Sequence, residues 1–137
     1  RVCIVGGIGP EKGYDVVLAC ARDAVLRNLP LEFVLVGHTP DDRRLLDTGR
    51  VAVTGTYREG EGETLVREQQ ADIAWLPSLW PETWCFTLGV AWRAGLKAAV
   101  FDIGAQAERV KATGQGWVLP LGLPVQAINN TLLAVEP

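Results

Sequence analysis

Short apolar runs alternate with longer amphipathic segments along this chain, and the two patterns predict different elements. Six segments favour strands because they are short and mostly apolar, at residues 1–5, 31–36, 50–54, 72–76, 97–101 and 116–119. Six others favour helices or helical turns, at residues 13–28, 41–46, 63–70, 83–94, 105–113 and 125–135. In the first of these, Val16, Val17, Cys20 and Ala24 recur with the period of a helix.

This alternation of strand and helix predicts the fold class. Apolar strands joined by helical crossovers form a parallel sheet that is covered on both faces. We therefore expect an α/β fold, a doubly wound, Rossmann-like, three-layer domain with a six-stranded parallel sheet. No internal repeat or linker interrupts the pattern, so residues 1–137 are expected to form a single domain. In such sheets, ligands bind at the carboxyl ends of the strands.

Composition narrows the class of protein. Of the 137 residues, 48% are hydrophobic and 21% are charged, which is typical of a globular domain. The net charge is −3 and no basic stripe is present, so nucleic acid is not an expected partner. No apolar run is long enough to span a bilayer and no signal peptide is visible. Cys3, Cys20 and Cys85 are predicted to be reduced core thiols, which favours a cytoplasmic protein.

The ends of the chain suggest a longer polypeptide. Arg1 stands directly inside a strand-like run, and the sequence contains no methionine. Pro137 follows a helix-like run immediately. We expect the chain to be a piece of a larger protein.

Residues 77–95 carry the strongest functional signal. They follow a predicted strand and hold three of the five tryptophans together with a lone carboxylate, Glu82. The segment ends in a basic residue and Gly95, as helices commonly do. Glu82 is thus expected near the amino end of a helix, where the partial positive charge favours an anion. This is also the edge of the sheet at which ligands are expected.

The first loop, Gly7-x-Gly9-x-x-Lys12, lies between a predicted strand and a predicted helix. Backbone N–H groups and the helix dipole at such a place suit a phosphate, and Lys12 would add a positive charge. The dinucleotide fingerprint requires glycine where Lys12 stands. It also requires an acid after the second strand, where this chain has Gly37-His38. A nicotinamide dinucleotide is therefore disfavoured, and a tight turn with a solvated lysine remains the alternative to a phosphate site.

Other candidate residues give weaker signals. His38 is the only histidine, and it is either a proton donor at the ligand edge or an ordinary loop residue. Without a second histidine or paired cysteines, no metal site is expected. Ser78 is the only serine and does not stand in a nucleophile elbow. Among the tryptophans, Trp84 beside Glu82 is the better ligand candidate, whereas Trp92 is expected in the core.

Several motifs taken together resemble a known family. They are Val5–Gly13, Phe33–Gly37, Val53–Gly55, Ala71–Ile73, Leu76–Ser78, Pro81–Trp84, Ala94-Gly95, Asp102–Gly104 and Glu108. In this order they resemble the donor-binding half of a group 1 glycosyltransferase of the GT-B fold, across essentially the whole chain. Such enzymes have two Rossmann-like domains, and the carboxyl-terminal one holds a nucleotide-sugar.

The resemblance implies a function and its partners. The chain would bind a UDP- or GDP-sugar, and the sugar would pass to an acceptor held by an amino-terminal domain that this sequence lacks. The family retains anomeric configuration and needs neither a metal nor another cofactor for transfer. Peripheral membrane association would concern the full-length enzyme only, and the isolated domain is expected to be inactive.

The resemblance also implies roles for individual residues. Lys12, in the loop of Gly7 and Gly9, matches the lysine that binds the donor pyrophosphate. Glu82 matches a glutamate that contacts the donor sugar, and it is the one residue for which the resemblance implies a catalytic role. Backbone groups of the following segment would approach the sugar and phosphates, with Thr83, Trp84, Cys85 and Thr87 as substrate-binding residues. Tyr57, next to Arg58, would line the nucleobase pocket.

Three positions depart from the family pattern. Val90 stands where a second glutamate would bind the ribose hydroxyls, and Gly7 stands where an arginine would assist the lysine. Cys85 replaces a glycine that follows the aromatic residue. The alternative reading is therefore a degenerate, non-catalytic domain that serves as an interaction or structural module. A free-standing receiver or flavodoxin-like domain is weaker, because a receiver needs clustered acids where Gly6 and Gly7 stand.

Overall fold

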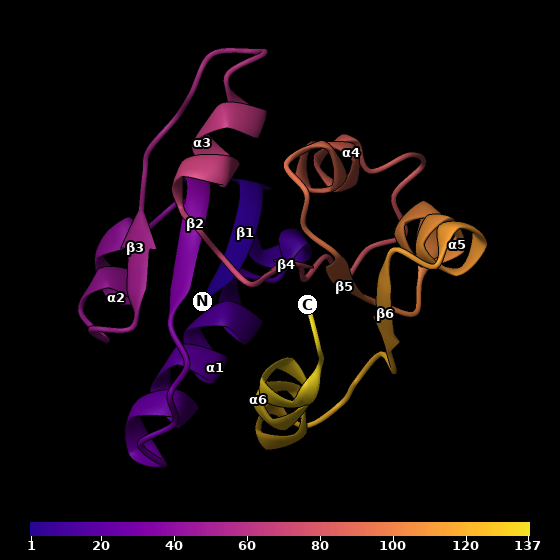
Figure 1. Ribbon diagram of the computed structural model, residues 1–137. Helices are drawn as coiled ribbons and strands as arrows, with labels where there is room; N and C mark the ends of the chain where they lie inside the picture. Colours follow the sequence, from indigo (N-terminus) through magenta and orange to yellow (C-terminus); the bar gives the residue numbers. More distant parts are fainter.

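The computed structural model describes residues 1–137 and contains one six-stranded, all-parallel sheet (Figure 1). Its strand order is β3-β2-β1-β4-β5-β6. The strands are β1 (Val2–Gly7), β2 (Phe33–His38), β3 (Val51–Val53), β4 (Ile73–Leu76), β5 (Ala98–Phe101) and β6 (Gly116–Leu119). The predicted fold class, a doubly wound Rossmann-like sheet, is thereby confirmed.

Helices cover both faces of the sheet, so the domain has three layers. They are α1 (Tyr14–Leu26), α2 (Asp42–Leu46), α3 (Gly62–Glu68), α4 (Phe86–Arg93), α5 (Gly104–Thr113) and α6 (Val125–Ala134), with a short 3₁₀ turn η1 (Pro10–Lys12) before α1. Figure 1 shows α1 and α6 side by side, away from α3, α4 and α5. None of these helices is long and apolar enough to cross a membrane.

Alternate residues of each central strand enter different cores. In β1, Val2 and Ile4 join the core under α1 and α6, whereas Cys3 and Val5 join the core under α3, α4 and α5. Side chains of successive strand residues point to opposite faces, and here both faces are covered. This explains why the strands are continuous apolar runs in the sequence. Trp75 of β4 is fully buried in the larger core.

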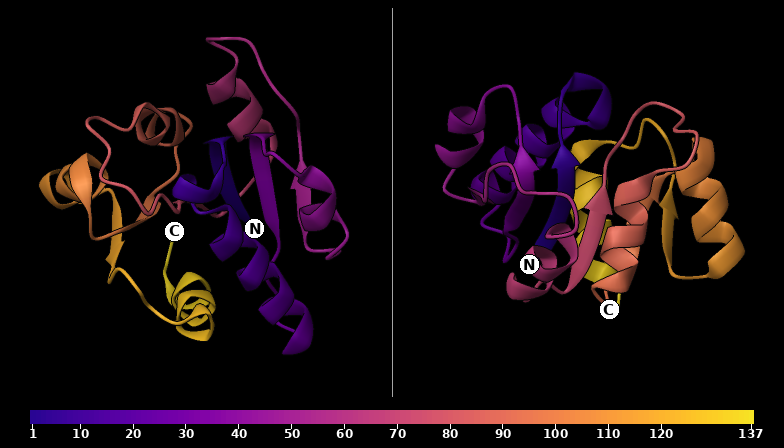
Figure 2. Two further views of the ribbon diagram at one scale, coloured as in Figure 1. Left: turned by 180° about the vertical axis from the view of Figure 1, so that it is seen from behind. Right: turned by 90° about the horizontal axis from the view of Figure 1, so that it is seen from above.

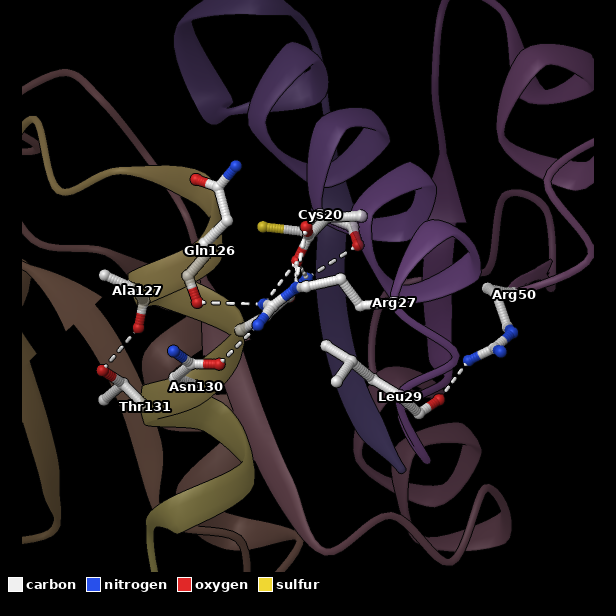
Figure 3. Close-up of polar contacts among 10 residues, drawn as sticks. Cys20, Arg27, Leu29, Arg50, Gln126, Ala127, Asn130 and Thr131 are labelled. Atoms are coloured by element: carbon white, nitrogen blue, oxygen red, sulfur yellow. Dashed lines mark hydrogen bonds and ion pairs between the residues drawn. The ribbon is translucent and has the colours of Figure 1, made fainter.

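A polar contact ties α6 to α1 within this arrangement. The Arg27 guanidinium donates to the Gln126 carbonyl oxygen at 3.2 Å and to the Asn130 side chain at 3.0 Å (Figure 3). It also pairs with the buried carboxylate of Asp23, which accepts from Asn129 at 2.9 Å. The guanidinium and the Asn129 amide hold the pKa of Asp23 below its usual value. The last helix is therefore fixed to the first by hydrogen bonds to this ion pair as well as by apolar packing.

One helix begins later than the sequence predicts. The pattern favours a helix from residue 83, but α4 begins at Phe86. Cys85, its N-cap, has φ 69° and ψ 76°, a left-handed conformation that a helix cannot continue through. Glu82 consequently precedes the helix rather than standing in its first turn, and the predicted contact with the helix dipole is wrong in this detail.

The order of the strands reverses between β1 and β4, and the chain closes tightly there. Gly13 has φ 98° and lies so close to Pro77 that a Cβ would stand 2.3 Å from the Pro77 carbonyl oxygen. Leu79 donates its backbone N–H to the Glu11 carbonyl oxygen at 2.9 Å. The loops after β1 and β4 are therefore fixed against each other at the edge of the sheet toward which the strand arrows point in the right-hand view of Figure 2.

Candidate functional site

Lys12 and Glu82 form an ion pair at this reversal point. The Lys12 ammonium contacts the Glu82 carboxylate, although the two residues stand 70 positions apart in sequence. The side chain of Glu82 is 17% exposed and that of Lys12 is 37% exposed. Both residues lie at the carboxyl edge of the sheet, where the sequence predicts a ligand site, and both face open hollows there.

The first hollow lies directly over the ends of β1 and β4 and has a volume of about 240 Å³. Its floor is backbone from Gly6, Gly7 and Pro77, and its walls include the Lys12 and Glu82 side chains. A sheet edge where the strand order reverses is the usual ligand crevice of this fold class. A Cβ at Gly6 would lie 3.2 Å from Thr87 Cγ2 and one at Gly7 would lie 3.1 Å from His38 Cε1, so these glycines allow the neighbouring side chains to pack closely over the strand end.

A second hollow of about 340 Å³ lies on the other side of the ion pair. It is formed by the loop before α4, including Trp80, Thr83 and Trp84. Trp80 and Trp84 are 64% and 52% exposed, far more than core tryptophans. Lys12 and Glu82 line this hollow and the first one, so the charged pair stands between two open spaces.

The third hollow is the largest, at about 590 Å³, and lies between α3 and α4. Tyr57 and Trp84 supply aromatic walls, and Val90 lies on the α4 side. Glu63 contributes a carboxylate that is paired with Arg67 and, at 3.5 Å, with Arg93. Burial raises the pKa of the Tyr57 hydroxyl, so it remains a neutral hydrogen-bonding group.

The structure gathers most of the sequence-predicted site residues at this edge. Gly7, Lys12, Tyr57, Glu82, Thr83, Trp84, Cys85 and Thr87 each line at least one of the three hollows. Gly9 lines none of them, because it is the N-cap of η1 and faces the Glu11 carboxylate. Arg58 is exposed and does not line the hollow beside Tyr57.

The weaker candidates are placed as follows. His38 is exposed and its ring lies above Gly7, where a Cβ would be 3.1 Å from Cε1 of the imidazole. Cys85 and the other two cysteines are buried free thiols, as predicted. Trp92 is half-buried, packs against the smaller core and donates to the Gln115 carbonyl oxygen at 2.8 Å. No group of three or more His, Cys, Asp or Glu side chains is arranged to hold a metal ion.

Three residues at the site are not among those predicted from the sequence. Phe86 is 79% exposed and lines all three hollows, so it separates them as a projecting ring. Gln106 and Arg109 lie on α5 and bond to the loop before α4. An exposed phenylalanine directly after Cys85 could have been noticed, but the α5 residues contact the loop only through the tertiary fold.

Comparison with known families decides the class. The family model described as "Glycosyl transferases group 1" matches residues 1–135. This chain belongs to the group 1 glycosyltransferases. As a member of that family, it carries the predicted β1 loop with Lys12 and the β4 loop with Glu82 at the edge where the strand order reverses.

Solved structures share the fold of this glycosyltransferase chain. Anabaena Alr3699/HepE in complex with UDP-glucose superposes with a TM-score of 0.74 at 20% identity, over 96% of this chain and 37% of that one. AviGT4, a glycosyltransferase involved in avilamycin A biosynthesis, gives 0.68 at 18% identity, over 99% and 42%. WaaG, a glycosyltransferase involved in lipopolysaccharide biosynthesis, gives 0.70 at 18% identity, over 96% and 36%.

These comparisons also define what portion of a relative the chain represents. It spans 36–42% of the length of the three structures named above. No curated protein matches its sequence. The similarity to the solved structures therefore establishes the fold, and the family model establishes membership.

Proposed function

We propose that this chain is the donor-binding half of a glycosyltransferase and that it holds a nucleotide-sugar, a UDP- or GDP-sugar, at the carboxyl edge of its sheet. The sugar would pass to an acceptor held by a second, amino-terminal domain of the same polypeptide. The full-length enzyme would work in the cytoplasm, with its acceptor either free or at a membrane surface. Within this proposal no metal takes part in transfer.

The observation that carries the proposal is the Lys12–Glu82 pair between two hollows. A nucleotide-sugar combines a diphosphate, which needs a cation, with a sugar, whose hydroxyls need an acceptor such as a carboxylate. The two side chains supply these groups side by side. The nearby third hollow, with Tyr57 and Trp84, has the size and aromatic walls that suit a nucleoside.

The chemistry of this chain's own residues follows from their charges. A diphosphate entering beside Lys12 would compete with Glu82 for the ammonium. Lys12 then stabilises the charge that develops on the leaving diphosphate as the bond to the sugar breaks. Glu82, released from Lys12, accepts hydrogen bonds from the sugar hydroxyls and orients the ring. Both groups are partly withdrawn from water, which strengthens these interactions.

Calorimetric titration of the folded chain tests this proposal. UDP, GDP, UDP-glucose and GDP-mannose are titrated in turn, with uridine and guanosine as ligands that lack phosphate. We expect heat from one diphosphate series and much weaker binding of its nucleoside. No heat from any diphosphate at millimolar concentration would overturn the proposal.

A degenerate, non-catalytic module is the second candidate, and two observations favour it. Val90 presents no acceptor to the third hollow, and Gly7 presents no cation to the first. The double variant Gly7→Arg, Val90→Glu separates the two readings. If nucleotide binding appears only in the double variant, the natural chain is the degenerate module. If the natural chain already binds a nucleotide diphosphate, the hypothesis of a degenerate module is wrong.

A further inference from the structure

Residues of helix α5 bond to the loop before α4 at several points between Trp80 and Cys85. Gln106, which is fully buried, donates from Nε2 to the Trp80 carbonyl oxygen at 2.8 Å. Its Oε1 accepts from the Glu82 backbone N–H at 3.2 Å. The Ala105 backbone N–H donates to the Glu82 carbonyl oxygen at 2.9 Å. Both backbone groups of Glu82 are thus bound by α5, and its side chain is left facing the hollows.

Arg109 stands one turn further along α5 and holds the other end of this loop. Its Nη1 donates to the carbonyl oxygens of Trp84 and Cys85, both at 2.9 Å. Its guanidinium carbon lies 3.9 Å from the centroid of the Trp84 ring and 5.1 Å from that of Trp92. One planar group therefore fixes two carbonyls and stacks on the indole that separates the second and third hollows.

The loop needs this support because its backbone is strained. Cys85 is a non-glycine residue at φ 69°, a conformation that costs on the order of 1 kcal/mol or more. Such a conformation persists only where surrounding contacts determine it. The Cys85 carbonyl is one of the two groups that Arg109 binds, so the guanidinium acts directly on the strained residue.

We infer that Arg109, assisted by Gln106, is a positioning residue of the site. It holds the Trp84 ring as a fixed wall and sets the direction of the backbone from Glu82 to Thr87. The effect on ligand binding rests on the proposed function, whereas the effect on the loop itself does not. Arg109 also lines the third hollow, but the contacts that make it a positioning residue are those with Trp84 and Cys85.

The first experiment measures the loop without any ligand. The chain is labelled with 5-fluorotryptophan, and the fluorine resonances of Trp84 and Trp75 are compared between the natural chain and Arg109→Gln. Trp75 is fully buried and reports on the core, whereas Trp84 reports on the loop. We expect the Trp84 resonance to move toward that of free 5-fluorotryptophan while the Trp75 resonance stays in place.

The matched control is Lys111→Gln, which removes a positive charge from the same helix. Lys111 pairs with Asp102 at 2.8 Å and does not contact the loop. It should leave both resonances unchanged. If Arg109→Gln also shifts the Trp75 resonance, the core is disturbed, and the comparison is repeated with Arg109→Lys. This milder variant keeps the positive charge but loses the planar guanidinium. An unmoved Trp84 resonance in a folded Arg109 variant overturns the inference.

The second experiment measures the nucleotide. In a chain that binds UDP or GDP, Arg109→Gln should weaken binding about tenfold or more, whereas Lys111→Gln should leave it within about twofold. Equal affinities in the natural chain and the Arg109 variant overturn the positioning role in binding. Absence of binding in the natural chain overturns the proposed function instead, and the fluorine comparison still decides whether Arg109 holds the loop.

Discussion

Gly13 and Pro77 lie closer than any side chain on Gly13 would allow. A Cβ on Gly13 would stand 2.3 Å from the Pro77 carbonyl oxygen and 2.8 Å from Pro77 Cβ. This contact joins the start of α1 to the loop after β4, and it is the reason why Lys12 and Glu82 meet. The site is therefore built on a backbone approach that a single glycine permits.

Gly13→Ala tests this relationship. The new methyl would collide with backbone and would also have to adopt φ 98°, so we expect a loss of about 3 kcal/mol in the free energy of unfolding. Gly49→Ala is the control, because Gly49 has φ 74° and nothing within 4 Å of the added Cβ. It should cost only about 1 kcal/mol. Urea denaturation measures both, and equal losses would contradict the proposed close packing.

Lys12→Gln tests the cation of the site. The variant keeps a hydrogen-bond donor but removes the charge, so we expect UDP or GDP affinity to fall by about tenfold. Binding of the corresponding nucleoside, which lacks phosphate, should not change. Lys111→Gln, which removes a lysine outside the site, should bind both ligands as the natural chain does. Calorimetry measures the affinities, and a uniform loss for nucleotide and nucleoside would contradict a phosphate contact.

Glu82→Gln separates the sugar from the diphosphate. Because Glu82 occupies the Lys12 ammonium, its neutralisation should leave affinity for the free nucleotide diphosphate equal or slightly higher. The gain in affinity that the sugar gives to the nucleotide-sugar should be lost. The measurement is the ratio of the two dissociation constants, with Glu68→Gln on the exposed face of α3 as the control. An unchanged ratio would mean that Glu82 does not contact the sugar.

Val90→Glu tests the missing ribose contact. Val90 is half-buried and lines the third hollow, so a carboxylate there could accept hydrogen bonds from a ribose. We expect nucleotide affinity to rise about tenfold, which corresponds to one added charged hydrogen bond. Val90→Leu changes the volume without adding an acceptor and should give no gain. A 2′,3′-dideoxynucleotide, which lacks the ribose hydroxyls, should bind Val90→Glu no more tightly than it binds the natural chain. An equal gain in affinity for this ligand would mean that the carboxylate does not bind the ribose.

Asp23 gives the fold a dependence on pH. Pairing with Arg27, and secondarily the Asn129 hydrogen bond, lowers its folded pKa, whereas the unfolded chain titrates near the ordinary value of about 3.9. Between the lowered folded pKa and the ordinary unfolded value, the unfolded state therefore binds more protons than the folded state. The stabilisation by Asp23 is fully present above about pH 4 and is lost as the pH falls through the folded pKa. Asp23→Asn should lower stability at pH 6 and flatten the acid slope. Asp47→Asn, at an exposed pair with Arg43, should follow the natural chain in urea titrations from pH 2.5 to pH 6.

Several features of the site could be predicted from sequence because they have local signatures. The glycines before Lys12 and the tryptophans around Glu82 follow strands, and the carboxyl ends of parallel strands share one edge. The start of α4 could not be predicted, because the side chains after Glu82 are compatible with a helix. The left-handed Cys85 depends on Arg109 and on packing of the loop against α5.

The sequence by itself determined the succession of strands and helices along the chain and the burial of both faces of the sheet. Those features depend on the period with which apolar residues recur, and a period is read from neighbours along the chain. Only the tertiary structure decided that Gly13 meets Pro77, that Lys12 therefore meets Glu82, and that Arg109 holds the loop beside them. Such contacts join residues far apart in sequence, and close packing selects them without leaving any local pattern.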